Sequence, residues 1–485
     1  MKTTQANRPS QVEDRIVSLI EQMMDVVPKG TALGLCDLIS AMFSGYFIES
    51  GGAVMPAVEA FLRQEVEDEE ERAARSRRAA KALTYGSYNL KELIDKLREI
   101  VEEEGVWEPI IIQGYRVAPV DGTAYRRAAV KRLESKAYFS DTNRAVPAVP
   151  IGMIATVGEV NGQRIALLKN AVVTDVKTND SVADKQELYR QVAIGLEEDE
   201  IGVFDAGFKL VEAAEAGIEQ CVIRLALNCT FGKTAGEIPE RTSAKGRTPT
   251  QHKAEIVRPL ERRHGGKTIP AHPAHEICTI TDELVHHLVL KFGLCSLWIG
   301  HLFSVDDALG QEMKVHIWNK VYLLERHLKK VKESKQDELR QMPIKVMAIY
   351  DPAYANPLLI GTPLLSLKPD AGRKIYAARW SVEGLPQTGK YILSGGGGTH
   401  YVHHSTAMKR LPTLSLVFGS LLKYVAATLP PFRTGFWDRL LLPTYGRLLR
   451  HLKKVGIPLS EQLFKKDSAT AHLPVGYEAI RLANA

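Results

Sequence analysis

Apolar residues in the middle of the chain form short runs with the length of strands, and two of these runs lead to an aspartate. Residues 115–120 (YRVAPV) precede Asp121, and residues 201–204 (IGVF) precede Asp205. Such runs are consistent with buried strands that end at the carboxylate and carry it to the edge of a sheet. An Asp-Gly pair such as Asp121-Gly122 is by itself most often a turn, so neither aspartate alone indicates catalysis.

The surrounding segments predict the other elements of an α/β arrangement. Asn161-Gly162 separates two apolar runs and favours a type I′ hairpin turn, because both residues accept a positive φ. The order of elements over this part of the chain is therefore β-β-β-α-β-α-β. Besides the two strands that precede the aspartates, its members are residues 151–160 and 164–169 (strands), 181–195 and 208–216 (helices) and 221–227 (strand).

The N-terminal part of the chain has the periodicity of helices. Apolar positions recur at helical spacing in residues 15–24, 33–47, 58–82 and 89–104. The third of these segments contains an acidic run (EVEDEEE) followed by a basic run (RAARSRRAAK). Helices of mixed charge suit either a DNA-binding domain or a dimerisation element, and the pattern does not choose between them.

Residues 411–429 are the most apolar stretch of the chain. Pro412, Lys423 and four Ser or Thr residues interrupt this stretch, so we expect a buried helix and no membrane span. Residues 1–14 are almost entirely polar and do not have the pattern of a signal peptide. Both observations predict a cytoplasmic protein.

Four polar residues near position 380 have the spacing of one helical face. Tyr376, Arg379, Glu383 and Lys390 follow the pattern Tyr-x2-Arg-x3-Glu-x6-Lys. At about 100° per residue, their side chains would leave a helix within an arc of roughly 60°. A carboxylate in this setting can bind a hard cation while Arg and Lys neutralise phosphate oxygens. The alternative interpretation is a solvated, salt-bridged surface, which also has this spacing.

With Trp380 directly after Arg379, the pattern resembles the Tyr-Arg-Glu-Lys (YREK) signature of bacterial insertion-sequence DDE transposases, in particular the insertion-sequence-four-like group. The resemblance covers about residues 110–430. It implies an α/β fold with a ribonuclease H-like catalytic core, for which β-β-β-α-β-α-β is the order of elements. It also implies an inserted β-rich subdomain, a helical N-terminal domain and a helical C-terminal region.

The resemblance also implies the roles of the polar residues. Asp121, Asp205 and Glu383 would be catalytic and would bind two Mg²⁺ ions, for which Mn²⁺ can substitute, to cut and join DNA by in-line phosphoryl transfer. The implied contacts to DNA phosphates come from Tyr376, Arg379 and Lys390. The partners would be double-stranded DNA, as terminal inverted repeats and target, and a second copy of the chain in a DNA-bound homodimer. A nucleoid-associated location follows.

Two features of the sequence complicate the match to the Tyr-Arg-Glu-Lys signature and its three acids. Gly384 and Pro386 lie between the glutamate and Lys390, and an interior proline kinks a helix, so the helical phase of Lys390 does not follow from its spacing. Asp351 is a rival acid because it follows residues 345–350, which have the pattern of a strand. It lacks the cationic helical face of Glu383 and ranks second.

The interval between the second and third acids indicates an insertion. Asp205 and Glu383 are more than twice as far apart in the sequence as Asp121 and Asp205, which is more than one helix and one strand need. The expected domains are residues 1–108 (helical N-terminal DNA-binding domain), 109–232 with 343–404 (catalytic core), 233–342 (inserted subdomain) and 405–485 (helical C-terminal region).

Composition adds a local excess of positive charge. The chain of 485 residues has 45% hydrophobic residues, enough for two to three domains, and a net charge of +6. Residues 233–267 contain nine Lys or Arg against four Glu, and residues 431–466 contain eight Lys or Arg. Both segments could contact phosphates. The alternatives are a solvated linker for the first and an amphipathic surface helix for the second.

The cysteines do not indicate disulfides or zinc. The five cysteines are scattered and include no CxxC pair, as expected for free thiols in a reducing compartment. His272, His275 and Cys278 have a suggestive spacing but no fourth ligand.

Two other functions share the predicted acids. One is a domesticated, catalytically inactive DNA-binding protein, and the other is a ribonuclease H-like nuclease that cuts but never joins strands.

Overall fold

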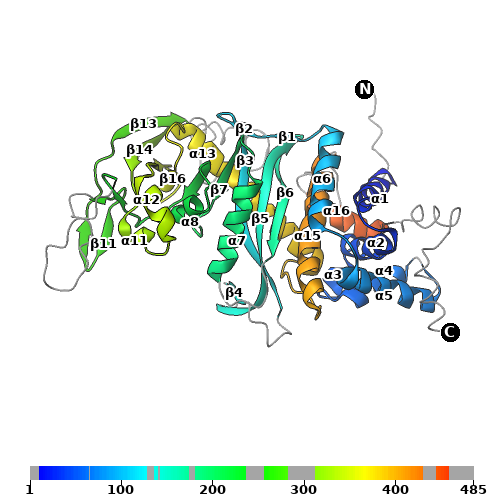
Figure 1. Ribbon diagram of the computed structural model, residues 1–485. Helices are drawn as coiled ribbons and strands as arrows, with labels where there is room; N and C mark the ends of the chain where they lie inside the picture. Colours follow the sequence, from blue (N-terminus) through cyan, green and yellow to red (C-terminus); the bar gives the residue numbers. More distant parts are fainter. Residues whose placement is uncertain are drawn as a thin grey trace, which may run out of the picture. The chain divides into compact units, whose positions relative to one another are not determined.

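The computed structural model describes residues 10–64, 66–127, 136–139, 143–173, 181–235, 256–281, 312–429 and 444–457. The chain is mixed α/β, as the sequence predicts, and forms two compact units (Figure 1). The helical unit consists of Met1–Glu104, Tyr125–Lys131 and Thr388–Ala485. The sheet unit consists of Gly105–Ala124 and Arg132–Gln387.

One large mixed sheet organises the sheet unit. Strands β3 (Tyr115–Arg126), β7 (Glu200–Phe204) and β8 (Cys221–Arg224) are parallel neighbours in this order. On the other side of β3 lies β5 (Arg144–Val160), which pairs antiparallel with β6 (Gln163–Val173). The three parallel strands are therefore flanked by β5 on one side and by β16 (Leu358–Thr362) on the other.

The hairpin between β5 and β6 is the one predicted from its turn residues. Asn161 and Gly162 have φ values of 47° and 71°, and Val160 pairs with Gln163 across the turn. A positive φ at both central positions is what a type I′ turn requires.

Four antiparallel strands extend the sheet beyond β8. β16 (Leu358–Thr362) pairs with β8 and is followed by β15 (Ile344–Tyr350), β14 (Glu312–Val321) and β13 (Glu276–Thr281). The last two strands belong to residues 233–342, which the sequence assigns to an inserted subdomain. Backbone hydrogen bonds therefore join this segment to the same sheet as the aspartate-bearing strands.

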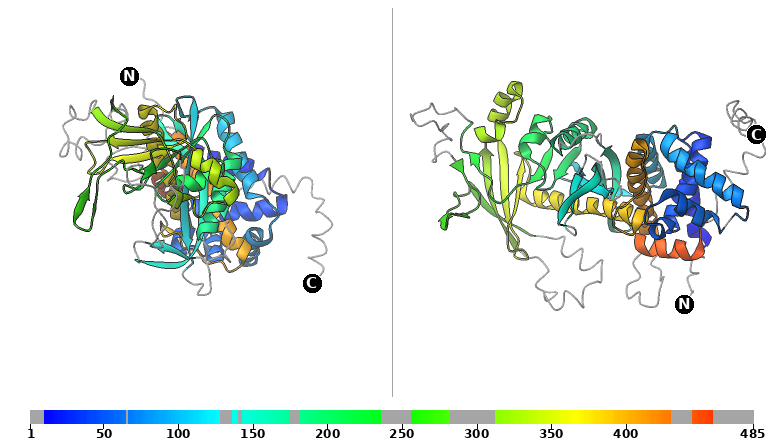
Figure 2. Two further views of the ribbon diagram at one scale, coloured as in Figure 1. Left: turned by 60° about the vertical axis from the view of Figure 1, so that its left-hand side comes forward. Right: turned by 90° about the horizontal axis from the view of Figure 1, so that it is seen from below.

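Helices cover both faces of the sheet. α7 (Ser181–Gly195) and α8 (Leu210–Glu215) pack with Phe204 on one face, and α13 (Pro369–Ala378) packs with Val203 on the opposite face. In Figure 2, α7 (green) and α13 (yellow) lie on opposite sides of the sheet in the view from below. Neighbouring residues of β7 thus face different layers and are both fully buried. This explains why residues 201–204 of the strand are apolar throughout instead of alternating.

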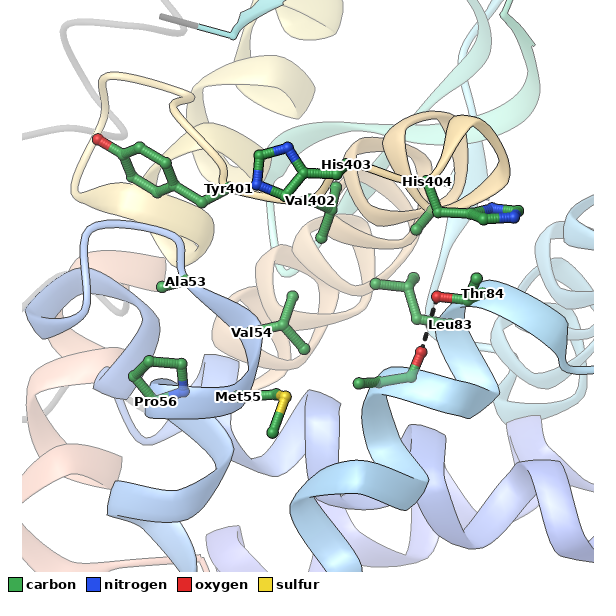
Figure 3. A pocket seen from close by; sticks show the side chains of 12 residues that line it. Ala53, Val54, Met55, Pro56, Leu83, Thr84, Tyr401, Val402, His403 and His404 are labelled. Atoms are coloured by element: carbon green, nitrogen blue, oxygen red, sulfur yellow. Dashed lines mark hydrogen bonds between the residues drawn. The ribbon is translucent and has the colours of Figure 1, made fainter. Parts of the chain in front are cut away.

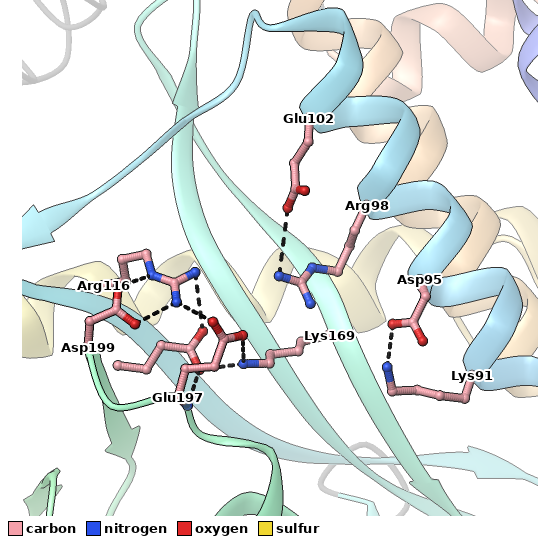
Figure 4. A network of polar contacts seen from close by, with 9 residues as sticks. Lys91, Asp95, Arg98, Glu102, Arg116, Lys169, Glu197 and Asp199 are labelled. Atoms are coloured by element: carbon pink, nitrogen blue, oxygen red, sulfur yellow. Dashed lines mark hydrogen bonds and ion pairs between the residues drawn. The ribbon is translucent and has the colours of Figure 1, made fainter.

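A charged network joins β3, β6 and β7 at the start of the parallel pair (Figure 4). Arg116 of β3 donates to both carboxylate oxygens of Asp199 at 2.6 Å. Lys169 of β6 lies 3.0 Å from Glu197 and also donates to Glu200. Because Glu200 is fully buried, its charge needs a paired cation, which Lys169 provides.

The helical unit combines helices from both ends of the chain. The sequence assigns these ends to separate regions, residues 1–108 and 405–485, whereas they pack in one unit. The N-terminal members are α1 (Ser10–Met24), α2 (Lys29–Phe43), α3 (Tyr46–Glu49), α4 (Val54–Leu62), α5 (Glu69–Tyr85) and α6 (Leu90–Glu104). The C-terminal members are α15 (Ser405–Thr428) and α16 (Tyr445–Val455).

The burial of α15 explains why the N-terminal and C-terminal helices pack in one unit. In the part of the chain that the structure describes, it is the single helix long and apolar enough to cross a membrane, but 89% of its apolar window is buried. It contacts α5, α6 and α16. A helix that is apolar on nearly every side must be enclosed by other elements. The prediction of a buried helix here is confirmed.

The helix expected over residues 58–82 is two helices. α4 ends at Leu62, and α5 begins after Asp68, whose side chain accepts a hydrogen bond of 3.0 Å from the backbone N–H of Glu70. An aspartate in this position satisfies a free donor of the first turn, and the acidic residues that follow interact favourably with the helix dipole. The acidic run therefore starts a helix and does not continue one.

A buried ion pair joins α2 to α5. The guanidinium of Arg75 donates to the two carboxylate oxygens of Asp37 at 2.6 and 3.1 Å. The two residues are 6% and 2% exposed. Burial raises the pKa of Asp37, and the hydrogen bonds from Arg75 oppose this effect. Each charge is therefore tolerated because the other is present.

We expect Asp37→Ala to lower the free energy of unfolding by about 3–5 kcal/mol, because Arg75 would become an uncompensated buried charge. The double variant Asp37→Leu/Arg75→Met removes both charges and should recover most of the loss. Urea denaturation followed by circular dichroism measures both changes. Equal losses in the two variants would show that packing, and not the unpaired charge, sets the cost.

Candidate active site

β3 and β7 bring Asp121 and Asp205 side by side. Their parallel register pairs Val120 with Phe204, so each aspartate occupies the next position on its chain. Neighbouring strands of a sheet lie about 4.8 Å apart. β7 ends at Phe204 as predicted, but β3 continues beyond Asp121, because the buried Tyr125 belongs to the same extended segment. The prediction that this strand ends at residue 120 is wrong.

The signature residues lie in consecutive segments of different helix type. α13 passes directly into a 3₁₀ segment, η2 (Arg379–Glu383), and then into α14 (Gly384–Ser394). A 3₁₀ helix has three residues per turn, so the prediction of one α-helix with four side chains in one arc is wrong. Pro386 lies in the first turn of α14, where its missing N–H is tolerated. η2 packs against β5 and β6 of the sheet.

The guanidinium of Arg379 nevertheless lies among the three acids. Its Nη2 atom is 3.0 Å from Oε1 of Glu383, and its Nη1 atom is 3.9 Å from Oδ2 of Asp121. Asp205 also favours the charged form of this arginine. Arg379 is 2% exposed. Acids from two strands and one 3₁₀ segment thus share one buried positive charge.

Two aromatic rings complete the surroundings of Arg379. Its guanidinium carbon lies 5.5 Å from the centroid of the Tyr376 ring and 5.1 Å from that of Trp380, within the range of cation–π attraction. The phenol of Tyr376 donates a hydrogen bond of 3.0 Å to Oδ1 of Asp205. Arg379 can therefore contact a phosphate only after its side chain leaves this position.

Arg224 is a member of the cluster that the sequence did not single out. It is the last residue of β8, and its Nη1 atom lies 3.6 Å from Oδ1 of Asp205. Phe204 pairs with Ile223, so Arg224 occupies the position opposite Asp205 on the next strand. The predicted strand extended to residue 227, which placed this arginine in a strand interior. A strand predicted to end at residue 224 would have placed Arg224 at the strand end, beside Asp205.

The surroundings move the pKa values of the two aspartates in opposite directions. Burial raises the pKa of Asp121, against a backbone hydrogen bond and the charge of Arg379. Burial also opposes ionisation of Asp205, but a backbone N–H, Arg379 and Tyr376 outweigh it and lower its pKa. Burial likewise disfavours the charge of Arg379, yet Tyr376 and the acids raise its pKa. An ionised Asp205 beside a charged Arg379 is the stable combination.

The residue types of this cluster suit a hard divalent cation, because carboxylate oxygens are preferred ligands of Mg²⁺ and Mn²⁺. In the described ranges, no three His, Cys, Asp or Glu side chains gather closely enough to share a metal ion. Asp121, Asp205 and Glu383 surround Arg379 instead. The donor set fits the cation, and in this arrangement the arginine supplies the positive charge.

Lys390 lies in the other unit. It belongs to the part of α14 that packs in the helical unit, where its Nζ atom is 5.6 Å from the centroid of the Tyr125 ring. The sheet unit brings together five of the six residues predicted for the site, and Lys390 is the exception.

Asp351 has a partner of its own. This rival acid follows β15, and its Oδ2 atom lies 3.4 Å from Nη2 of Arg373 on α13. Both residues line a pocket of about 180 Å³, to which Tyr376 and Trp380 also contribute. Asp351 therefore borders the cluster around Arg379 without joining it.

The basic segments predicted to contact phosphates lie partly outside the described residues. Of residues 233–267, positions 236–255 are outside, and the remainder includes a small hairpin of β11 (Arg262–His264) and β12 (Lys267–Ile269). Of residues 431–466, only 444–457 are described, and they contain α16.

The sequence matches no protein-family model, and no curated protein is significantly similar to it. The functional assignment therefore depends on the cluster around Arg379 and on the order of elements that assembles it.

We expect Arg379→Met to lower the free energy of unfolding by about 1 kcal/mol at neutral pH in EDTA, because the carboxylates would lose their shared counter-charge but are 23% to 45% exposed and therefore partly screened by water. Added Mg²⁺ or Mn²⁺ should stabilise this variant more than the wild type, because binding to the folded state then compensates the missing charge. Thermal unfolding with and without the cation measures the difference.

Arg373→Met is the matched control for this experiment, because it removes an arginine of α13 that pairs with a different acid, Asp351. Its stability should respond to the cation as the wild type does. If both variants gained equally from the cation, Arg379 would not be the counter-charge of the cluster.

Proposed function

We propose that the protein is a DNA transposase of the DDE class, which cuts the ends of an insertion element and joins them to target DNA. The observation that carries this proposal is the convergence of Asp121, Asp205 and Glu383 on one buried guanidinium. A solvated surface of salt bridges needs only residues of one helix. Here two acids come from adjacent parallel strands and the third from a segment far along the chain.

The order of elements supports a ribonuclease H-like core. β3, β5, β6, α7, β7, α8 and β8 occur in the β-β-β-α-β-α-β order expected for that fold, with the short strand β4 (Lys136–Phe139) added between β3 and β5. The two strands that precede acids, β3 and β7, are neighbours within the sheet. The long interval before Glu383 contains β13 to β16, in keeping with an insertion into such a core.

The chain's own residues would prepare the reaction as follows. Divalent cations held by Asp121, Asp205 and Glu383 would supply Lewis-acid activation of a water or 3′-hydroxyl and stabilisation of the leaving 3′-oxygen. Tyr376 fixes one oxygen of Asp205 by a hydrogen bond and so orients this carboxylate. Arg379, once turned away from Glu383, can donate two parallel hydrogen bonds to phosphate oxygens. No covalent intermediate with the protein is required.

The proposed partners follow from this chemistry. They are the terminal inverted repeats of the element and its target, both double-stranded DNA, which places the protein in the cytoplasm next to the nucleoid. A nuclease that never joins strands, or an inactive DNA-binding protein, would retain part of the same site. Cleavage and strand-transfer assays separate these functions, because only a transposase is positive in both.

We expect Asp121→Ala, Asp205→Ala and Glu383→Ala each to abolish Mg²⁺-dependent cleavage while binding of the element's end is largely retained. Loss of a cation ligand removes stabilisation of the transition state, whereas affinity comes mainly from Lys and Arg contacts to phosphates. Gel assays of cleavage and binding on the same DNA measure the two effects.

Asp351→Ala is the matched control, because it removes a neighbouring acid outside the cluster. It should cleave at a rate close to that of the wild type. Substantial cleavage by any of the three cluster variants would remove that residue from the site.

We expect the active form to contain at least two copies of the chain on DNA. Each set of three acids acts on one end at a time, so two element ends joined to one target need two sets. Sedimentation velocity with and without end-containing DNA measures the change in stoichiometry. A complex of one protein with one end that still performed strand transfer would contradict this expectation.

A further inference from the structure

The C-terminal half of α5 presents cations without acidic partners. Arg77, Lys81 and Tyr85 are four residues apart and therefore lie along one face of the helix. Arg77 and Lys81 are exposed, and neither forms an ion pair or a hydrogen bond with any residue that the structure describes. Tyr85 is 75% exposed. Two free charges and an aromatic ring thus point into solvent from consecutive turns.

A pocket of about 290 Å³ lies beside this face, within the helical unit (Figure 3). Ala80 and Thr84 of α5 line it, each three residues after a cation of the exposed face and therefore next to it on the helix surface. Met55, His403 and His404 line it from other segments. None of the lining residues is an acid, so nothing in the pocket wall repels an anion.

Aromatic residues surround this pocket. The rings of Tyr85 and His404 meet edge to face, with centroids 5.3 Å apart. Tyr401 is 46% exposed. We call the combined surface the α5 patch; it consists of Arg77, Lys81, Tyr85, Tyr401, His403 and His404. Cations interleaved with exposed aromatic rings are the composition of a nucleic-acid-binding surface.

In the other basic helix of this unit, α16, the cations have partners among the described residues, except for the exposed Lys454. Lys453 lies 2.6 Å from Glu49, and His451 lies 2.6 Å from Glu13. Arg447 and Arg450 also have interaction partners. Phosphate contacts by α16, other than one by Lys454, would therefore replace existing interactions, whereas both Arg77 and Lys81 can bind phosphates without such a loss.

Charge changes sign along α5. Its first turn contains Glu69, Glu70 and Glu71, all exposed, and follows the exposed Asp68. DNA phosphates are repelled by this end and attracted by the half that carries the cations. An α-helix fits the major groove of a duplex, and the reversal of charge restricts the approach to the C-terminal half of α5.

We propose that the α5 patch is the surface with which the helical unit binds duplex DNA. The proposal rests on the proposed function, because it assigns to this surface the binding of the same DNA that the acids would cut. Arg77 and Lys81 contact phosphates, and Tyr85 packs against the sugar or base edges beside them.

The test is a fluorescence anisotropy titration of the full-length chain with a labelled duplex taken from the DNA that flanks the coding region. Arg77→Ala/Lys81→Ala should bind more weakly, and the slope of log affinity against log salt should fall by about 2, one for each lost phosphate contact. Tyr85→Ala should weaken binding without changing the slope, because the ring carries no charge.

Lys91→Ala/Lys96→Ala is the matched control. It removes two positive charges from α6 of the same unit, but these lysines pair with Asp95 and Glu99. Its affinity and salt slope should equal those of the wild type. An equal loss in the control would overturn the proposal, since net charge would then explain the effect, and so would wild-type binding by Arg77→Ala/Lys81→Ala.

Cleavage by the wild type in Mg²⁺, measured on the same duplex, separates this inference from the proposed function. A wild type that binds but does not cleave would overturn the proposed function, and the α5 variants would still decide the patch. A wild type that cleaves while Arg77→Ala/Lys81→Ala binds and cleaves equally well would overturn the patch alone. Circular dichroism of each variant verifies that the helices are retained.

Discussion

The positive charge of Arg379 is the constraint on which the arrangement of the sheet unit's acids depends. Carboxylates from separate segments cannot all stay ionised close together without a cation, because mutual repulsion and, for the partly buried Asp121, desolvation oppose their ionisation. Arg379 satisfies Glu383 directly and reaches Asp121 across the cluster. The rings of Tyr376 and Trp380 shield the same charge from water. An ion pair between Arg379 and Asp121 joins the 3₁₀ segment to the sheet at this point.

One buried side chain cannot neutralise three acids and bind a phosphate at the same time. The proposed chemistry therefore requires Arg379 to change partners. It leaves the acids when divalent cations bind to them, and it then contacts the phosphate. Trp380 is 58% exposed, so one of the two rings beside Arg379 lies at the protein surface. Under the proposed function, metal binding and DNA contact are coupled through one guanidinium.

Local patterns were sufficient where neighbours in sequence decide the structure. The turn at Asn161-Gly162 and the placement of Asp205 after a buried strand follow from a few adjacent residues. The break before α5 was also legible, because Asp68 is a good helix-capping residue followed by three glutamates. The apolar periodicity on both sides of this break predicts one continuous helix, and the capping residue overrides it.

Features that depend on distant contacts were not predictable in this way. The segment RWSVE contains neither Gly nor Pro, so the change to a 3₁₀ helix at Arg379 is not marked locally, whereas Gly384 and Pro386 predict an irregularity only beyond Glu383. The burial of Arg379 depends on acids that reach it from two strands. The pairing of β14 with β15 likewise joins segments whose relation no local periodicity encodes. Such features follow from tertiary packing, which overrides local preference.

The salt bridges at the start of the parallel pair have a consequence for the acids at its end. The ion pair of Arg116 with Asp199 favours the observed alignment of β3 and β7, and Asp121 and Asp205 lie at the other end of the paired segment. Side chains on a strand alternate between faces, so a slip of one residue would turn one aspartate to the wrong side of the sheet. The ion pairs thus influence the positions of two carboxylates that they do not contact. A substitution at Arg116 would weaken this alignment without touching either aspartate.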